Sequence, residues 1–304
     1  MDNAIHERSR TGYVLVFLAL IMLVVLVATI AASLVLNNPG ATAPTENEET
    51  IQHTASDTEE VWEEEPTEEE DTSPASVLHL LPTNPYGQFD FQYDGWFLKS
   101  TAVECLSGID VSAYQGDIDW EQVKEAGVDY AIIRLGYRGY ESGKLVEDKF
   151  ARKNLDGATA AGIPIGVYFF SQALSEEEAR EEAQFVLDMI ATYEVTMPVV
   201  FDWEHIHNDS ARTNGMDPYV VTDCAKAFLE IIDGAGYWPM MYFNSFQARK
   251  LFYLDQLMEY DFWLALYSDR MTFPYKVDMW QYTSTGTIPG VFGDVDVNVL
   301  FLHE

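Results

Sequence analysis

Apolar residues follow three patterns along the chain, and each pattern predicts a different kind of segment. A continuous apolar run covers residues 13–36, a polar stretch with few apolar positions covers residues 37–83, and short apolar stretches alternate with helix-like segments over residues 107–304. Short strands that alternate with helices are typical of an α/β fold with a parallel sheet. The third region is therefore expected to carry the main domain.

Eight stretches of this region have the composition of buried strands. They begin near Gly108, Tyr130, Ile165, Val199, Pro239, Phe262, Met279 and Val295. Helices are expected near Asp119, over residues 149–161, after Ser175, where three glutamates follow a capping serine, and from Pro218 to Ile232. Eight strands with intervening crossovers predict a TIM-like (β/α) barrel, which should be irregular because its last crossovers are too short for full helices. A doubly wound sheet is the alternative.

The apolar run at residues 13–36 predicts a transmembrane signal anchor. At 1.5 Å per residue it is long enough to cross the roughly 30 Å hydrocarbon core. A cleaved signal peptide is the competing interpretation, but its apolar region usually has only about 7–15 residues. Arg8 and Arg10 place residues 1–12 in the cytoplasm. We expect a single-pass protein of the plasma membrane that contacts the lipid bilayer through residues 13–36 and carries its main domain outside the cytoplasm.

Two further segments separate this anchor from the main domain. Residues 37–83 are rich in Glu, Thr, Pro and Ser, and cannot bury enough apolar surface to offset the entropy cost of ordering, so a disordered acidic linker is expected. Residues 84–106 bring back aromatic side chains. Alternating aromatics before Asp94-Gly95 predict a small hairpin, an N-terminal extension that packs on the main domain.

Composition narrows the range of partners. The 304 residues include 50 acidic and 17 basic side chains, a formal net charge of −33, which argues against a nucleic-acid partner. Two cysteines, Cys105 and Cys224, are too few for a disulfide framework, and their spacing does not tell whether they pair. We expect a monomer.

Candidate chemistry centres on the strand that ends in Asp202 and Glu204. Side chains at i and i+2 of a strand point the same way, about 6.5–7 Å apart along the backbone. Such a pair suits chemistry that needs one protonated and one charged carboxyl group. Asp110 and Asp296 lie on two other predicted strands. Because the C-terminal ends of barrel strands share one face, we expect the four acids to converge there.

Other polar and aromatic side chains near these strand ends are candidates for substrate binding. They are Tyr114, Tyr168, Phe170, Tyr242, Asn244, Trp263, Tyr267, Gln281 and Asn298. Acids combined with aromatic rings suit a neutral sugar chain. His205 and His207 suggest a metal hydrolase as a rival, but they would face away from Glu204 and no matching ligand cluster accompanies them, so no metal and no cofactor are expected.

Four motifs resemble the family 25 glycoside hydrolases, the lysozyme-type N-acetylmuramidases of the Chalaropsis kind. They are Gly108-Ile109-Asp110-Val111-Ser112-x-Tyr114-Gln115-Gly116, Phe201-Asp202-Trp203-Glu204, Trp280-Gln281-Tyr282 and Gly293-Asp294-Val295-Asp296-Val297-Asn298. The resemblance implies cleavage of the β-1,4 bond between N-acetylmuramic acid and N-acetylglucosamine, with the peptidoglycan glycan strand as partner. It also implies that Glu204 donates the proton and that Asp202, Asp110 and Asp296 are the other active-site carboxylates.

Two questions remain open at the level of sequence. Asp202 can act as the nucleophile or can orient the substrate's own acetamide, since the spacing of the two acids fits either scheme. A non-catalytic barrel that only binds peptidoglycan is the alternative function, and the presence of all four carboxylates argues against it.

Overall fold

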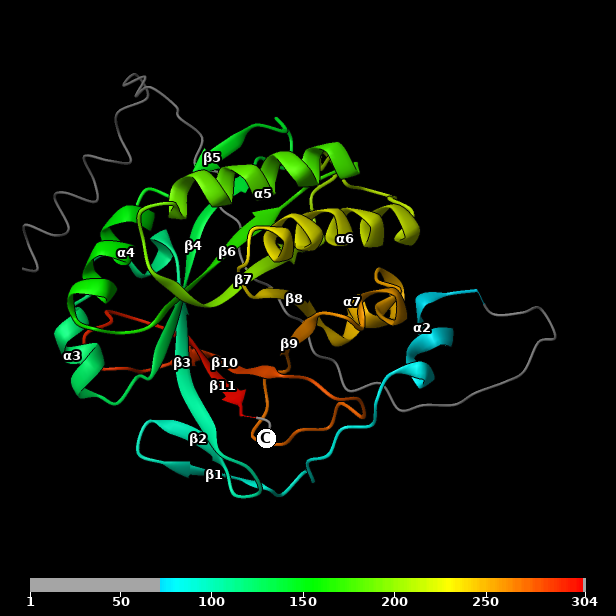
Figure 1. Cartoon of the computed structure of the whole chain (residues 1–304). Helices are drawn as coiled ribbons and strands as arrows, with labels where there is room; N and C mark the ends of the chain where they lie inside the picture. The colour runs from blue at the N-terminus through cyan, green and yellow to red at the C-terminus, as the bar shows by residue number, and fades with distance from the viewer. Residues whose placement is uncertain (1–71, 303–304) are drawn as a thin grey trace, which may run out of the picture. The chain divides into compact units, whose positions relative to one another are not determined.

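Eight strands close into a barrel in the structure, a computed structural model that describes residues 72–302 (Figure 1). Their order around the barrel is β3-β11-β10-β9-β8-β7-β6-β4, and β4 pairs with β3 to complete the circle. The strands are β3 (Cys105–Val111), β4 (Tyr130–Arg138), β6 (Ile165–Ser171), β7 (Val195–Trp203), β8 (Pro239–Asn244), β9 (Asp261–Ala265), β10 (Met279–Gly286) and β11 (Val295–Phe301). They match the eight predicted strands, so the barrel is confirmed and the doubly wound sheet is excluded.

One strand departs from the parallel arrangement. Seven barrel strands run parallel, whereas β11 is antiparallel to both of its neighbours, β10 and β3. Residues 287–294 join β10 to β11, and this segment is shorter than the dozen or more residues that a parallel crossover needs. A further short strand, β5 (Leu145–Glu147), pairs antiparallel with β4 outside the barrel. The expected irregularity at the end of the chain is therefore a reversed last strand.

Helices cover the parallel part of the barrel, with α5 and α6 side by side (Figure 1). Three of the four predicted helices begin where they were expected, and Asp119, Ser175 and Asp217 accept hydrogen bonds from the first turns of α3, α5 and α6. The helix expected from residue 149 begins at Ala151. The helices are α3 (Trp120–Glu125), α4 (Ala151–Ala160), α5 (Glu176–Ile190), α6 (Pro218–Gly234) and α7 (Ser245–Lys250), with 3-10 turns η2 (Ala113–Gln115) and η3 (Leu254–Leu257).

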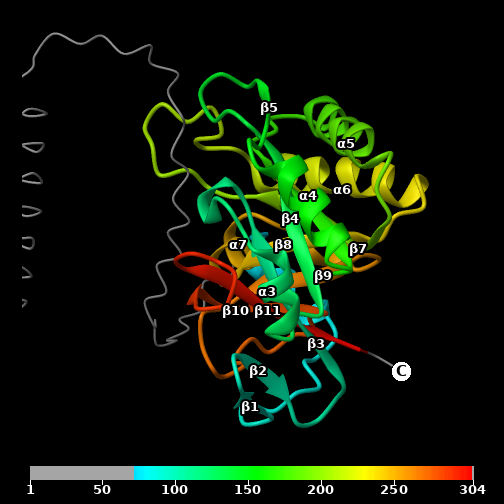
Figure 2. The same cartoon turned by 90° about the vertical axis from the view of Figure 1, so that its left-hand side faces the viewer.

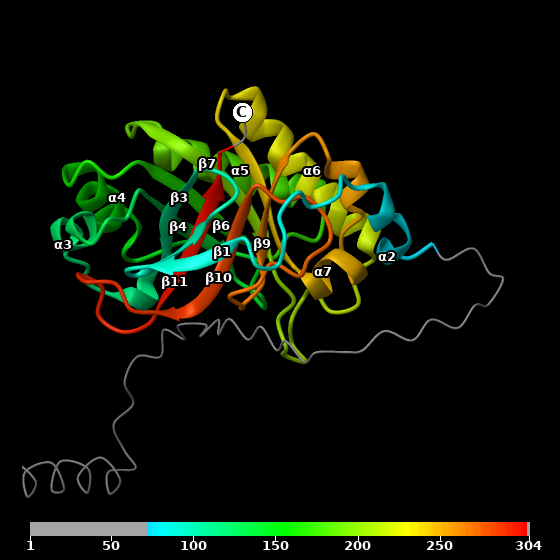
Figure 3. The same cartoon turned by 90° about the horizontal axis from the view of Figure 1, so that it is seen from below.

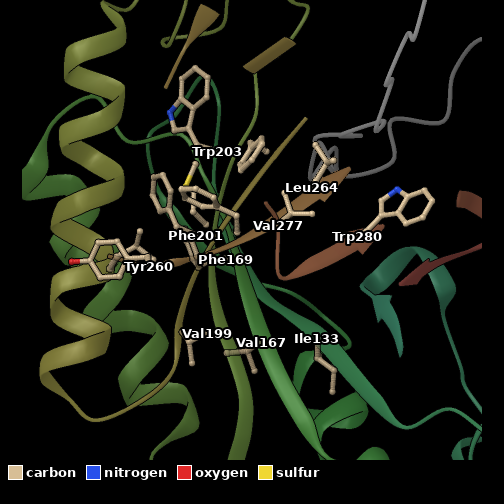
Figure 4. Close-up of a cluster of buried hydrophobic side chains, with 14 of the residues drawn as sticks. Ile133, Val167, Phe169, Val199, Phe201, Trp203, Tyr260, Leu264, Val277 and Trp280 are labelled. Carbon is tan, nitrogen blue, oxygen red and sulfur yellow. The ribbon is translucent and has the colours of Figure 1, made fainter. Parts of the chain in front are cut away.

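The barrel wall separates two apolar clusters. Side chains such as Ile132, Val200 and Met240 fill the inside of the barrel. The larger cluster lies outside, where Phe201 and Trp203 are among the side chains that pack in the helical layer (Figure 4). This division follows from the strand period of two, since consecutive residues of a strand point to opposite faces of the wall.

The aromatic N-terminal extension forms the predicted hairpin. Gly95, with φ of 61°, occupies the first position of its two-residue turn, where a positive φ favours glycine. The hairpin covers the outer face of β10 and β11, on the side of the barrel away from α5 and α6 (Figures 2 and 3). The Phe91 ring lies 5.0 Å from that of Trp280, between centroids. The strands are β1 (Phe91–Asp94) and β2 (Phe97–Ser100).

Part of the predicted linker, residues 74–81, packs on the barrel. Residues Pro74–Val77 form α2, Leu78–Leu80 form η1, and Leu78 and Leu81 are buried in the main core. The end of the acidic linker was therefore placed too late, because the apolar residues in this last part are enough to fix it on the barrel. The rest of the linker lies outside the described residues.

The predicted anchor at residues 13–36 also lies outside the described residues. Within residues 72–302, no helix is long and apolar enough to cross a bilayer.

Both cysteines are free thiols, with Cys224 buried and Cys105 half-buried.

Candidate active site

The four acidic candidates lie at one end of the barrel. Asp110 and Asp202 stand at the C-terminal ends of the parallel strands β3 and β7, and Glu204 follows β7 directly. Asp296 reaches this end differently. Because β11 is antiparallel, its beginning lies there, and Asp296 pairs in register with Asp110. The expectation that Asp296 marks the C-terminal end of a strand was wrong.

Alternation along β7 points Asp202 into the barrel. Phe201 and Trp203 belong to the outer apolar cluster, whereas Val200 belongs to the inner one. Asp202 therefore shares the inner face, where it is 3% exposed and lies in register with Tyr242 of β8. Its carboxylate lies in the top layer of the barrel interior, at the floor of any site that opens at this end.

Two buried amides hold the backbone that carries Glu204. Gln172 Nε2 donates to the Glu204 carbonyl oxygen at 2.7 Å, and Gln247 Nε2 donates to the Trp203 carbonyl oxygen at 2.5 Å. Thr213 Oγ1 in turn donates to Gln172 Oε1 at 2.9 Å. The half-buried Glu204 carboxyl group thus extends from a fixed backbone. Sequence reasoning missed both glutamines, since a buried amide has no distinctive sequence signal.

Asp110 is held by a network of side chains from four other strands or strand ends. Its Oδ2 accepts hydrogen bonds from Gln281 Nε2 at 2.9 Å and from Asn298 Nδ2 at 2.8 Å. Tyr242 and Tyr267 both donate their hydroxyl groups to Gln281 Oε1, each at 3.1 Å. The two phenols therefore fix the orientation of the Gln281 amide, so that its NH₂ group faces Asp110.

Asn298 is oriented in the same way. Trp263 Nε1 donates to Asn298 Oδ1 at 2.9 Å, which leaves the amide NH₂ to donate to Asp110. Two amide donors on one carboxylate oxygen favour its charged form. Trp263, Asn298 and Gln281, predicted to bind substrate, are all buried, and here they position the Asp110 carboxylate.

The raised pKa values of three tyrosines indicate that the four carboxylates are close together. Burial is the main cause that raises the pKa of Tyr168, Tyr242 and Tyr267 above the ordinary value, and for each ring the negative charge of three of the four carboxylates raises the pKa further. The three rings stand at different positions around the barrel, and charges from the same group of four acids raise the pKa of each one. At neutral pH these phenols keep their protons and serve as hydrogen-bond donors.

The remaining predicted substrate-binding residues differ in exposure. Phe170 and Tyr168 are buried in the barrel wall, and Tyr267 is half-buried. Tyr114, on η2, is 49% exposed and stands at the rim. Asn244 caps α7, where its Oδ1 accepts from the Gln247 backbone N–H at 3.0 Å. The spacing Asn244-x-x-Gln247 is a capping-box signal that could have predicted this role.

A buried ion pair supports the rim and was not predicted from sequence. Arg134 Nε donates to Asp148 Oδ2 at 2.8 Å, and the Ala113 backbone N–H donates to the same oxygen at 3.0 Å. The Arg134 guanidinium carbon lies 5.3 Å from the centre of the Tyr114 ring. Asp148 therefore ties the turn that carries Tyr114 to β4, and the guanidinium group makes a cation–π contact with the ring.

The histidines after β7 pack against each other. The ring centres of His205 and His207 are 4.9 Å apart, and the pKa of His205 is lowered by burial and, to a smaller degree, by His207. Among residues 72–302, no group of three or more His, Cys, Asp or Glu side chains is arranged to hold a metal ion.

Comparisons with known proteins bear on this site. A model of the family described as Glycosyl hydrolases family 25 matches residues 109–291. Lysozyme M1 of Streptomyces globisporus is 27% identical over 212 residues, which cover 64% of this chain and 67% of that protein. The solved structure of the Streptococcus pneumoniae modular autolysin LytC with a synthetic peptidoglycan ligand has a TM-score of 0.58 and 26% identity, and covers 65% of this chain.

This match spans less than half of the autolysin structure, 47% of its length. A family 25 glycosyl hydrolase from Bacillus anthracis, at 23% identity and a TM-score of 0.56, matches over 72% of this chain and 96% of its own. This second likeness supports the barrel fold.

Proposed function

This chain belongs to glycosyl hydrolase family 25, and we propose that it is a peptidoglycan hydrolase of the lysozyme type. It cleaves the β-1,4 bond between N-acetylmuramic acid and N-acetylglucosamine. The observation that carries the proposal is the meeting of Asp110, Asp202, Glu204 and Asp296 at one end of the barrel. The first three lie within residues 109–291, which match the family. The names of the lysozyme relative and of the autolysin's ligand support peptidoglycan as the substrate.

Glu204 is the proton donor in this mechanism. Its carboxyl group is half-buried and follows directly after β7, so it can reach a glycosidic oxygen in the opening of the barrel. Protonation of that oxygen lets the bond to the departing sugar break as an oxocarbenium-like state develops. Glu204 then takes the proton back from the water molecule that completes hydrolysis.

Asp202 is the charged partner of this pair. Its buried carboxylate stabilises the positive charge that develops on the sugar ring, and it orients the substrate's acetamide group for attack on the same carbon. Anomeric configuration is retained in this scheme. Asp110, held by Gln281 and Asn298, adds a fixed negative charge nearby, and Asp296 contacts sugar hydroxyl groups.

Replacement of Glu204 by glutamine tests the assignment. We expect Glu204→Gln to reduce release of reducing sugars from purified peptidoglycan by roughly 100-fold or more, while sedimentation with the insoluble polymer is unchanged. Glu194, exposed before the other end of β7, provides the matched control, and Glu194→Gln should act like wild type. Near-normal activity of Glu204→Gln would refute the assignment.

Mass spectrometry of the products separates the lysozyme from other activities. A new reducing end on N-acetylmuramic acid supports the proposal, whereas a new reducing end on N-acetylglucosamine contradicts it. Binding of peptidoglycan by the wild type without any new reducing end would identify the alternative, a non-catalytic peptidoglycan-binding barrel.

We also propose that residues 13–36 anchor the enzyme in the plasma membrane, with its catalytic domain outside the cytoplasm. The charge-free apolar run and the preceding Arg8 and Arg10 support this topology. The full chain should appear in the membrane fraction, and a variant that lacks residues 1–36 should not. Recovery of the full chain as soluble protein would contradict the anchor.

A further inference from the structure

A fully exposed aromatic side chain stands in the loop between β10 and β11. Phe292 is 92% exposed, although the neighbouring Val291 packs against the core and Ile288 is buried. A phenylalanine that stays in water forgoes the stabilisation that burial of its ring would give. A single exposed apolar residue is ordinary, so its position and its neighbours have to show whether it has a ligand.

The loop that carries Phe292 is fixed against the barrel rim. The Asp119 backbone N–H donates to the Gly290 carbonyl oxygen at 2.9 Å, and Gln115 Nε2 donates to the Asp294 carbonyl oxygen at 3.3 Å. Gly290 has a φ of +93°, and a Cβ there would lie 2.3 Å from the Asp119 carbonyl oxygen, so only glycine permits this close approach. The exposed ring therefore stands on an anchored loop.

A second exposed aromatic lies on the adjacent turn. Tyr114 directly precedes Gln115, which bonds the Phe292 loop, and its ring is supported by Arg134. Tyr114 follows β3, and Phe292 lies four residues before Asp296 of β11, at most about 14 Å away along an extended chain. Both rings thus belong to loops that leave the same end of the barrel as the four carboxylates.

We propose that Phe292 and Tyr114 form an aromatic platform that binds a sugar ring of the glycan strand beyond the cleaved bond. Pyranose rings present an apolar face of C–H groups, which packs on aromatic rings without needing charge. A glycan strand is a long neutral chain, so sugars on either side of the cleaved bond can bind outside the carboxylate centre, where the platform lies. This inference rests on the proposed function and adds an outer sugar-binding site to it.

Kinetics on long and short substrates test the platform. We expect Phe292→Ala to raise KM for polymeric peptidoglycan by about three- to tenfold with kcat almost unchanged. The shortest soluble glycan that the wild type cleaves should be affected much less, and Phe292→Trp should restore the wild-type KM. The control is Trp96→Ala in the β1–β2 turn, a 51% exposed aromatic on the hairpin, which should leave both constants unchanged.

The outcomes separate this inference from the proposed function. An active wild type with an unchanged KM in Phe292→Ala would overturn the platform and leave the lysozyme assignment in place. If the wild type releases no sugar, the function fails, and sedimentation with peptidoglycan decides the platform alone. Weaker binding by Phe292→Ala than by Trp96→Ala supports it, and equal binding overturns it.

Discussion

A single amide, Gln281, links the acid on β3 to two phenols on the opposite side of the barrel. We predict that Gln281→Glu lowers kcat on peptidoglycan by about 100-fold. The substitution keeps the shape and the acceptor for Tyr242 and Tyr267, but it replaces the donor to Asp110 by a second carboxyl group, and two acids at this distance must share a proton. The pH profile of kcat/KM should shift as well, which a merely structural change would not cause.

The matched control for this prediction is on the surface. Gln184 Nε2 of α5 donates a hydrogen bond to Asp188 Oδ1 at 2.7 Å. This pair has the same chemical groups as Gln281 and Asp110 but is exposed to water. Gln184→Glu should leave kcat and the pH profile unchanged. If Gln281→Glu behaves like Gln184→Glu, then the network around Asp110 does not position a group that the reaction needs.

Residues with distinctive sequence neighbours could be predicted, whereas residues that act through buried contacts could not. Asp202 and Glu204 end an apolar strand, and that spacing shows in the sequence. Arg134 and Asp148 meet only after folding, one from β4 and one from the loop after β5, and neither carries a local signal for a buried ion pair. Gln281 was expected at the site, but its inward hydrogen bonds depend on the register of β10 with β11.

At the scale of elements, an ion pair joins α5 to β4. Arg138 Nε donates to Glu182 Oε1 at 2.7 Å, and both side chains are buried. Removal from water raises the pKa of Glu182 to about 7, and this effect outweighs the Ser171 hydroxyl and the Arg138 guanidinium, which lower it. Between about pH 4.5 and pH 7 the folded chain therefore holds a proton that the unfolded chain has released.

We predict that Glu182→Gln changes how stability depends on pH. The contribution of Glu182 is complete below pH 4.5 and is lost as the pH rises through about 7, because the folded pKa exceeds the unfolded one. The wild type should thus lose up to about 3 kcal/mol of unfolding free energy relative to Glu182→Gln over this range. Urea denaturation at several pH values measures the difference.

Glu181 provides a control for this pair. Its exposed carboxylate also contacts Arg138, at 3.2 Å from Nη2. Glu181→Gln should follow the wild-type pH dependence, since water screens this contact. A parallel pH dependence of Glu182→Gln and wild type would contradict a titrating buried carboxyl group.

The order of the elements could be predicted better than their directions. Every barrel strand was expected from its apolar, β-branched composition. The direction of β11 depends on the length of segment 287–294, which was used to predict irregularity and which also excludes a parallel crossover. This reversal pairs Asp296 with Asp110. The position of Asp296 in the site therefore depends on the length of the β10–β11 connection and not on the sequence motif around it.

At the scale of the whole molecule, the hairpin takes the place of missing helices. Segments 266–278 and 287–294, which lead into β10 and β11, contain no helix, and the outer face of these strands would otherwise meet water. Instead the Leu98 backbone N–H donates to Tyr282 Oη at 3.0 Å, and Tyr86 lies 4.3 Å from Phe301 between ring centres. We infer that hairpin and barrel unfold together.

Adjacent aromatics in the hairpin test this inference. Phe97 is 4% exposed, and its ring faces Gly127 after α3, whereas Trp96 is 51% exposed. We predict that Phe97→Ala lowers the unfolding free energy of the barrel by about 3 kcal/mol, because it opens a cavity between hairpin and barrel. Trp96→Ala should change it by less than about 0.5 kcal/mol. Near-UV circular dichroism in urea measures the unfolding of the barrel through its buried tryptophans. If its midpoint stays unchanged in Phe97→Ala while proteases cleave the hairpin, the two parts unfold separately.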